Sequence, residues 1–131
     1  MFLSAIRTPT VTRSLQAQST RALSVSAALN EKKQFIVIAH DHTDADAQKR
    51  RLSVRETHLA GARALKKDGT LQLGGALLTN HSESGKMVGS IMIFSAESEE
   101  DVRKIIEKDQ YVQGNVWAKY DIYPFRQAAF P

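Results

Sequence analysis

Apolar and β-branched residues recur along the chain in short runs that are typical of strands. The run 34–39 is almost continuously apolar, which predicts a central strand buried on both faces. Two further runs, 71–79 and 87–95, are separated by a polar turn of about six residues and predict a hairpin. The last run, 116–123, alternates in strand fashion, and Pro124 is expected to terminate it. The pattern therefore predicts four strands.

Two other segments carry helical signals. Ser53 and Glu56 match the capping box S-x-x-E, in which each side chain satisfies a backbone N–H group at the start of a helix. Asp68-Gly69 is expected to end this helix about four turns later. The segment 98–109 begins with a similar capping signal and carries apolar residues at i, i+3 and i+4, so it predicts a second helix.

The elements follow the order β-α-β-β-α-β, which predicts an α+β, ferredoxin-like sandwich with one antiparallel sheet and both helices on one face. In this topology the helices run antiparallel, so the first helix starts at the end of the sheet where the second finishes. The first strand also ends there, and the hairpin loop and the start of the last strand lie beside it. We call this the histidine end, and any chemistry is expected there. The polar residues expected at it are His40, Asp41, His42, Arg51, Arg55, His58, His81, Asp109 and Tyr111.

Residues 1–30 differ in composition from the rest of the chain. They contain three arginines, five serines and four threonines, but no acidic residue. An Arg-rich, Ser-rich and acid-poor segment is typical of a mitochondrial transit peptide. We therefore predict that residues 1–30 are a disordered presequence that directs the protein to the mitochondrial matrix, and that residues 31–131 form one folded domain. The alternative is a disordered tail that has no targeting function.

Composition also excludes several kinds of site and partner. The formal net charge is +4, but residues 1–30 hold three of the 18 basic residues and none of the 14 acidic ones. The remaining chain carries +1, so its charge does not predict binding to nucleic acid. The absence of cysteine excludes disulfides, a thiolate nucleophile and cysteine-ligated metals. No run of about 18 apolar residues occurs, so no membrane span is predicted.

His58 is the most informative single residue, because it shares an apolar helix face with Val54, Gly61, Ala62 and Leu65. The small residues Gly61 and Ala62 leave free volume beside the imidazole, as in the wall of a pocket. The same pattern also fits close packing of a helix on a sheet. Residue type and spacing leave both interpretations open, and a buried histidine is more often a hydrogen-bonded member of the core.

Five short motifs follow one another between residues 33 and 127. They are Arg51-Leu52-x-x-Arg55-x-x-His58-Leu59, Gly74-Gly75-Ala76-Leu77, Gly89-Ser90, Asp109-x-Tyr111-Val112 and Pro124-Phe125. In this order and spacing they resemble the YCII-related domain family. Each motif is unspecific alone, whereas the ordered set is specific and covers essentially the whole chain after residue 30.

The resemblance implies a dimeric α/β-barrel, in which the sheets of two ferredoxin-like units pack together. It also implies a pocket with a catalytic His–Asp pair, which by position is His58 and Asp109. Some members of the family are similar to muconolactone isomerase or eliminate chloride from chlorinated ring-cleavage products. The family usually has a proline after this aspartate, which would stiffen the turn, and here Gln110 stands in its place.

The residues fit such chemistry. Asp109 is expected at the C-terminal end of the second helix, opposite the start of the first. An aspartate that accepts the N–H of His58 would fix the tautomer of the imidazole and leave its other nitrogen free as a general base or acid. Proton abstraction next to a carbonyl also needs donors for the developing oxyanion. The residues predicted to bind substrate are Arg51, Arg55, Ser90 and Tyr111.

Two other motifs have simpler interpretations. His40-Asp41-His42 could hold a metal together with His58, but strand alternation points His40 and His42 away from Asp41. A solvated loop is therefore predicted there, with no metal and no cofactor. Gly74-Gly75 lies inside a strand pattern and predicts a bulge or a close backbone approach rather than a phosphate loop.

Two functions remain open. The first is a small mitochondrial lyase or isomerase that acts on a small organic acid through the His58–Asp109 dyad. The second is a non-catalytic dimeric module that binds a small metabolite or only assembles. The expected partners are a second copy of the chain and a small organic acid. The homodimer follows from the family, and Val37, Ile91 and Ile93 suggest apolar residues on both faces of the sheet.

Overall fold

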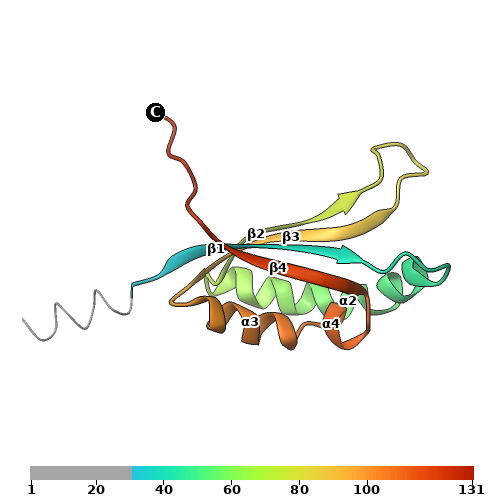
Figure 1. The fold of residues 1–131 in the computed structure, drawn as a ribbon, viewed down its shortest axis with the longest axis horizontal. Helices are drawn as coiled ribbons and strands as arrows, with labels where there is room; N and C mark the ends of the chain where they lie inside the picture. Colours follow the sequence, from blue (N-terminus) through green and yellow to red (C-terminus); the bar gives the residue numbers. More distant parts are fainter. Residues whose placement is uncertain (1–30) are drawn as a thin grey trace, which may run out of the picture. The chain divides into compact units, whose positions relative to one another are not determined.

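The computed structural model describes residues 31–131, and the predicted presequence, residues 1–30, lies outside them. Four strands, β1 (Lys33–Asp41), β2 (Leu71–Leu78), β3 (Met87–Ala96) and β4 (Trp117–Phe125), form one antiparallel sheet in the order β2-β3-β1-β4. The helices are α2 (Ala47–Lys67), α3 (Glu99–Glu107) and the short α4 (Gln110–Gln113). All three lie on one face of the sheet (Figure 1). The predicted α+β, ferredoxin-like topology is confirmed.

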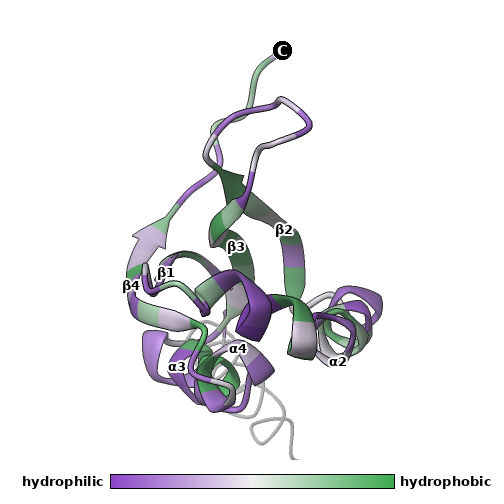
Figure 2. Ribbon diagram, turned by 90° about the vertical axis from the view of Figure 1, so that its right-hand side faces the viewer, coloured by the Kyte–Doolittle hydropathy of each residue, from purple (hydrophilic) through white to green (hydrophobic). Residues whose placement is uncertain are grey.

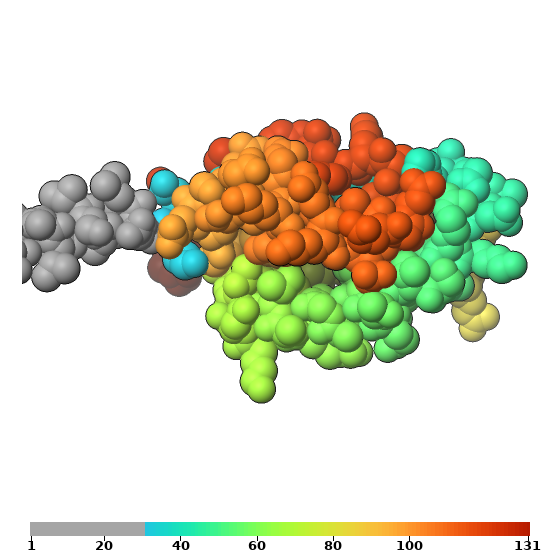
Figure 3. Space-filling view, turned by 90° about the horizontal axis from the view of Figure 1, so that it is seen from below, coloured from blue at the N-terminus to red at the C-terminus, as the bar shows by residue number. Residues whose placement is uncertain are grey.

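The core lies between the helices and one face of the sheet. Phe35, Val37 and Ala39 alternate along β1 and are buried with Val102 and Ile106 of α3. Figure 2 shows α3 beneath β1 and β4, and α2 beneath β2. From the helix side, α2 and α3 lie next to each other across the molecule (Figure 3).

The other face of the sheet, which we call the open face, is not covered by helices (Figure 2). Its apolar residues pair across strands, with Ile36 opposite both Ile93 and Tyr123, and Ile38 opposite Ile91. The four isoleucines are half-buried and Tyr123 is 50% exposed. Strand β1 is thus fully buried only on the side that faces the helices. Val37 faces the helices, whereas Ile91 and Ile93 lie on the open face, so these residues supply apolar side chains to both faces of the sheet, as predicted.

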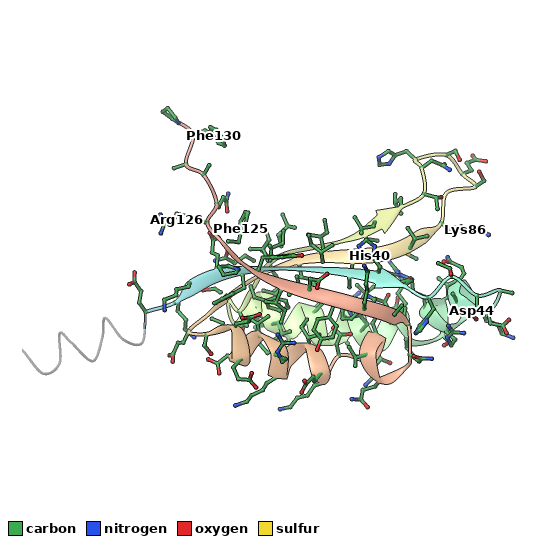
Figure 4. The ribbon with its side chains drawn as sticks, in the orientation of Figure 1. His40, Asp44, Lys86, Phe125, Arg126 and Phe130 are labelled. Carbon is green, nitrogen blue, oxygen red and sulfur yellow. The ribbon has the colours of Figure 1, made fainter. Side chains whose placement is uncertain are left out.

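Helix α2 begins at Ala47, six residues before the predicted capping box. Ser53 makes no cap, because its hydroxyl donates to the carbonyl oxygen of Arg50 inside the helix (2.7 Å). The first turn is instead fixed by Asp44, whose carboxylate accepts two hydrogen bonds from Arg50 (2.7 and 2.8 Å). Figure 4 shows Asp44 in the loop before the helix. Residues 47–52 favour helix over loop, since most of them are strong helix formers.

The other helix boundaries largely follow the sequence signals. Helix α2 ends at Lys67 and is followed by Gly69, whose φ of 87° lies in the region that favours glycine. The Ser98 side chain caps α3 by accepting the backbone N–H of Asp101 (3.2 Å). No helix in residues 31–131 is long and apolar enough to cross a membrane.

Three local predictions were wrong. The second helix ends at Glu107, and α4 follows it as a separate turn that no periodic pattern predicted. Pro124 does not end β4 but pairs with Phe35 inside it, which an edge strand tolerates because it donates to one neighbour only. The register of β2 shifts between Leu71 and Leu73, rather than at Gly74-Gly75.

Candidate functional site

The predicted dyad residues contact each other at the histidine end. His58 projects from α2, and its Nδ1 lies 2.7 Å from Oδ1 of Asp109, which directly precedes α4. The two side chains are 11% and 16% exposed. An ionised carboxylate can only accept, so the Nδ1–H group is the donor in this hydrogen bond. Nε2 of a neutral His58 is then unprotonated and able to accept a proton.

Asp109 is held by backbone as well as by the imidazole. Its Oδ1 also accepts the backbone N–H of Tyr111 (2.8 Å), which makes Asp109 the N-cap of α4. Asp109 lies two residues after the end of α3, as the sequence predicted, and its backbone N–H donates to the carbonyl oxygen of Ile106 (2.9 Å). Gln110 occupies the first helical position, where proline is favoured but not required. The loss of the family's proline therefore leaves Asp109 in contact with His58.

Tyr111 forms the wall behind the imidazole. Its ring stacks on His58 with 3.8 Å between ring centroids and 16° between planes, and Trp117 meets it edge-on at 5.5 Å. Tyr111 is 1% exposed. Burial raises the pKa of the Tyr111 phenol, against the opposing charges of Arg51 and Arg55, so the phenol is neutral at physiological pH.

A buried ionic network supports this wall. Nη1 of Arg51 donates to both carboxylate oxygens of Asp41 at 2.9 Å, and their side chains are 3% and 5% exposed. Nη2 of Arg51 donates to the Ser90 hydroxyl (3.1 Å), which also accepts the indole N–H of Trp117 (3.3 Å). The guanidinium carbon of Arg51 lies 4.5 Å from the centre of the Tyr111 ring. The charge of Arg51 is thus neutralised by a protein carboxylate.

The dyad and Arg51 of this network line a cavity of about 780 Å³ between α2 and the sheet. Ser90, Tyr111 and Arg55 line it too, so the structure brings the six predicted site residues together around one space. Ala62 also lines the cavity. Gly61 is exposed, and a Cβ atom added to it would meet no other atom within 4 Å, so Gly61 contributes no free volume to the pocket. Arg55 makes no hydrogen bond or ion pair to any residue of 31–131.

Two members of the network, Asp41 and Trp117, were not predicted as site residues. Asp41 continues the buried alternation of Phe35, Val37 and Ala39, so its period-two position was an available signal. Trp117 pairs with Asp41 only after a register shift between His40 and Asp41. No sequence pattern reveals that shift.

The remaining histidines lie away from the cavity. His40 is exposed on β1 (Figure 4). Its neighbour Asp41 is buried and continues the helix-side alternation of β1, as strand alternation predicts. Nε2 of His42 contacts the Asn115 side chain (3.0 Å), and His81 is exposed in the β2–β3 loop. Within residues 31–131 no group of three or more His, Asp or Glu side chains is arranged to hold a metal ion.

Comparison with known proteins identifies relatives over most of the chain. The sequence model of the YCII-related domain family matches residues 14–126. Fusaric acid biosynthesis protein 2 of Gibberella fujikuroi is 37% identical over 101 residues, which are 73% of this chain and 95% of that protein. Aspartate kinase FUB3 of Fusarium oxysporum is 38% identical over 103 residues, but the chain spans only 19% of its length.

A solved structure shares the fold. It is a 5-chloro-2-hydroxyhydroquinone dehydrochlorinase from Burkholderia phenoliruptrix AC1100 in complex with 2,5-dihydroxybenzoquinone. The two chains superpose with a TM-score of 0.63 at 25% sequence identity, and the match covers 72% of this chain and 95% of that one. The relatives therefore include proteins of small-molecule metabolism.

Proposed function

The chain belongs to the YCII-related domain family, and on that premise we propose that it is a small lyase or isomerase that acts on a small organic acid. The observation that carries the proposal is the 2.7 Å contact between His58 and Asp109 in the wall of the cavity. A dehydrochlorinase with the same fold supports an elimination or a related proton transfer. The names of the fungal relatives support a role in small-molecule metabolism.

In the proposed reaction, Nε2 of His58 removes a proton from the carbon next to a carbonyl group. The C–H bond breaks, and its electron pair moves into an enolate. Asp109 keeps the Nδ1–H group in place and stabilises the imidazolium that forms. In an isomerisation the proton returns to a different carbon, whereas in an elimination the enolate expels a leaving group such as chloride.

We assign the predicted substrate-binding roles among the four residues according to their contacts. Arg51 already binds Asp41, so the substrate carboxylate is assigned to Arg55, which lines the cavity. The Ser90 hydroxyl accepts two hydrogen bonds and keeps its own O–H free to donate. Ser90 is therefore the proposed oxyanion donor, with the neutral Tyr111 beside it.

The test is proton exchange, which needs no knowledge of the full reaction. A panel of 2-oxo acids and unsaturated lactone acids is incubated with the protein in D₂O, and deuterium uptake is followed by NMR. We expect at least one acid to exchange next to its carbonyl, with a rate that falls about 10²- to 10⁴-fold in His58→Gln. Asp109→Asn should slow exchange, because an amide can donate as well as accept a hydrogen bond. It therefore no longer keeps the proton of His58 on Nδ1 and Nε2 free to act as the base.

An acid that binds without exchange in any variant would instead favour the non-catalytic binding module. Exchange that is equally fast in wild type and in His58→Gln would exclude His58 as the base. Lys104→Gln is the matched control for surface changes, because Lys104 lies exposed on α3 and does not line the cavity.

We also propose a homodimer that packs through the open face. Its support is the apolar set Ile36, Ile38, Ile91 and Ile93, together with the half-exposed Tyr123. A contiguous apolar face of this kind is unusual on a monomer. Light scattering at micromolar concentration should give twice the chain mass, and Ile93→Lys should give the single mass. A wild-type monomer would refute the proposal.

The mitochondrial destination is a proposal that rests on residues 1–30 alone. A fusion of residues 1–33 to a fluorescent reporter should enter mitochondria, and replacing its three arginines with glutamine should leave the reporter in the cytosol. A reporter that stays diffuse with the native segment contradicts the proposal.

A further inference from the structure

The cavity extends well beyond the dyad. Its lining residues on α2 run from Arg51 to Lys67, a span of 16 residues that corresponds to ~24 Å along a helix. His58 lies near the middle of this span, seven residues from Arg51 and nine from Lys67, and Asp109 contacts it there. The cavity therefore has room for a ligand much longer than the reacting group that the dyad would handle.

The middle of the cavity is apolar. Helix α2 contributes residues spaced three or four apart on its inner face, and the sheet contributes buried side chains opposite them. None of the lining residues that the described sheet contributes is acidic or basic. The lining residues in this middle part are Leu59, Ala62, Leu65, Leu71, Met92 and Phe94. An apolar ligand body fits this part.

The far end of the cavity is basic. Nζ of Lys66 reaches across the opening from α2 and donates to the backbone carbonyl of Gln72 on β2 (2.7 Å). One hydrogen bond leaves two of the three ammonium protons free to donate. Arg63 and Lys67 line the same part, and Asp109, beside His58, is the single acidic residue among the lining residues described.

We propose that the cavity takes an elongated acid with an anionic group at each end. One end meets Arg55 and His58, the apolar body lies along Leu65 and Met92, and the second anionic group binds Lys66. Which end reacts rests on the proposed function, whereas the two-ended recognition does not. His58 and Lys66 are eight residues apart, or ~12 Å along the helix, which sets the length of the ligand body.

The test compares two ligand series that differ in one charge. Binding of octanedioate, decanedioate and dodecanedioate is measured by calorimetry beside octanoate, decanoate and dodecanoate, at constant ionic strength. We expect a long dicarboxylate to bind about tenfold more tightly than the monocarboxylate of equal length. This preference should disappear in Lys66→Gln, return in Lys66→Arg, and persist in Lys104→Gln.

Each outcome decides the proposal. Equal affinity for the two series in the wild type would overturn it, as would a Lys66→Gln variant that weakens both series alike. Absence of binding by either series would overturn it too. Because binding is measured without turnover, a protein that shows the preference but fails the proton-exchange test keeps this proposal and loses the catalytic one.

Discussion

The buried Asp41–Arg51 pair allows a direct test of how the site is supported. Asp41→Asn keeps the shape of the side chain but removes its charge, and leaves the guanidinium of Arg51 buried without a counter-ion. The two side chains are 5% and 3% exposed, so water cannot replace the lost partner. Breaking a buried ion pair on one side typically costs about 3–5 kcal/mol. The introduced amide can still accept one hydrogen bond, so we expect the lower value.

The corresponding shift in melting temperature is large. For a domain of this size, each 1 kcal/mol lowers the midpoint by about 4–8 °C, so ~3 kcal/mol gives roughly 12–24 °C. Thermal and urea unfolding are followed by circular dichroism at one fixed protein concentration, since dimerisation would make the midpoint concentration-dependent. The double variant Asp41→Leu/Arg51→Met should recover much of the loss, because it leaves no buried charge.

Asp44→Asn is the matched control, since Asp44 also accepts two hydrogen bonds from one arginine. Arg50 holds the pKa of the Asp44 carboxyl well below its usual range, so any stability from this pair is present at neutral pH and is lost as pH falls. The pKa shift suggests a strong pair, but the Asp44 side chain is 51% exposed and solvent screens it. We expect a midpoint close to wild type. An Asp41→Asn variant no less stable than Asp44→Asn would refute the argument.

Three further predictions concern single residues. Ser98→Ala removes the cap of α3 and should cost about 1 kcal/mol in urea unfolding, whereas Ser53→Ala should be close to neutral because Ser53 caps nothing. Gly69→Ala should cost about 1 kcal/mol in the same assay, because the φ of 87° strains any side chain. Burial raises the pKa of Tyr111 above 10.0, so the stability that this neutral phenol contributes is present below pH 10.0 and is lost as the pH rises further. Between neutral and alkaline pH, the Tyr111→Phe variant should therefore lose less stability than the wild type. Identical alkaline loss in both proteins would contradict the assignment.

The sequence predicted those parts of the fold that depend on neighbouring residues. Helix α3 was predicted correctly at its start, because the Ser98 cap and the buried stripe of Val102 and Ile106 are local. The start of α2 was not, because it depends on Asp44 and Arg50 contacting across the first turn rather than on a capping side chain. A four-residue helix such as α4 is shorter than any periodic pattern.

In the site, too, some contacts could be predicted from the sequence and others could not. Contact between His58 and Asp109 follows from topology, since antiparallel helices bring the start of one beside the end of the other. The Arg51 network could not be predicted, because it joins Asp41 and Ser90 through the register of β1 and β3. Register is set by the packed sheet, and a shift of one residue would turn either side chain to the open face.

The distribution of charge is the reason that the proposed function assigns the substrate carboxylate to Arg55 rather than to Arg51. Arg51, Arg55 and His58 lie at i, i+4 and i+7 on α2 and therefore share one face. Asp41 neutralises Arg51, and Asp109 faces His58, so Arg55 is the cation of this face that a carboxylate can still pair. In the proposed reaction, the imidazolium formed at His58 would lie 2.7 Å from Asp109, and the negative charge of the enolate would lie toward Ser90 and Arg55. The proposed proton transfer would thus create two charges that each meet a fixed opposite charge or donor. An Arg55→Gln variant should accordingly weaken acid binding while its dyad stays intact, and an Arg51→Gln variant should unfold more readily instead.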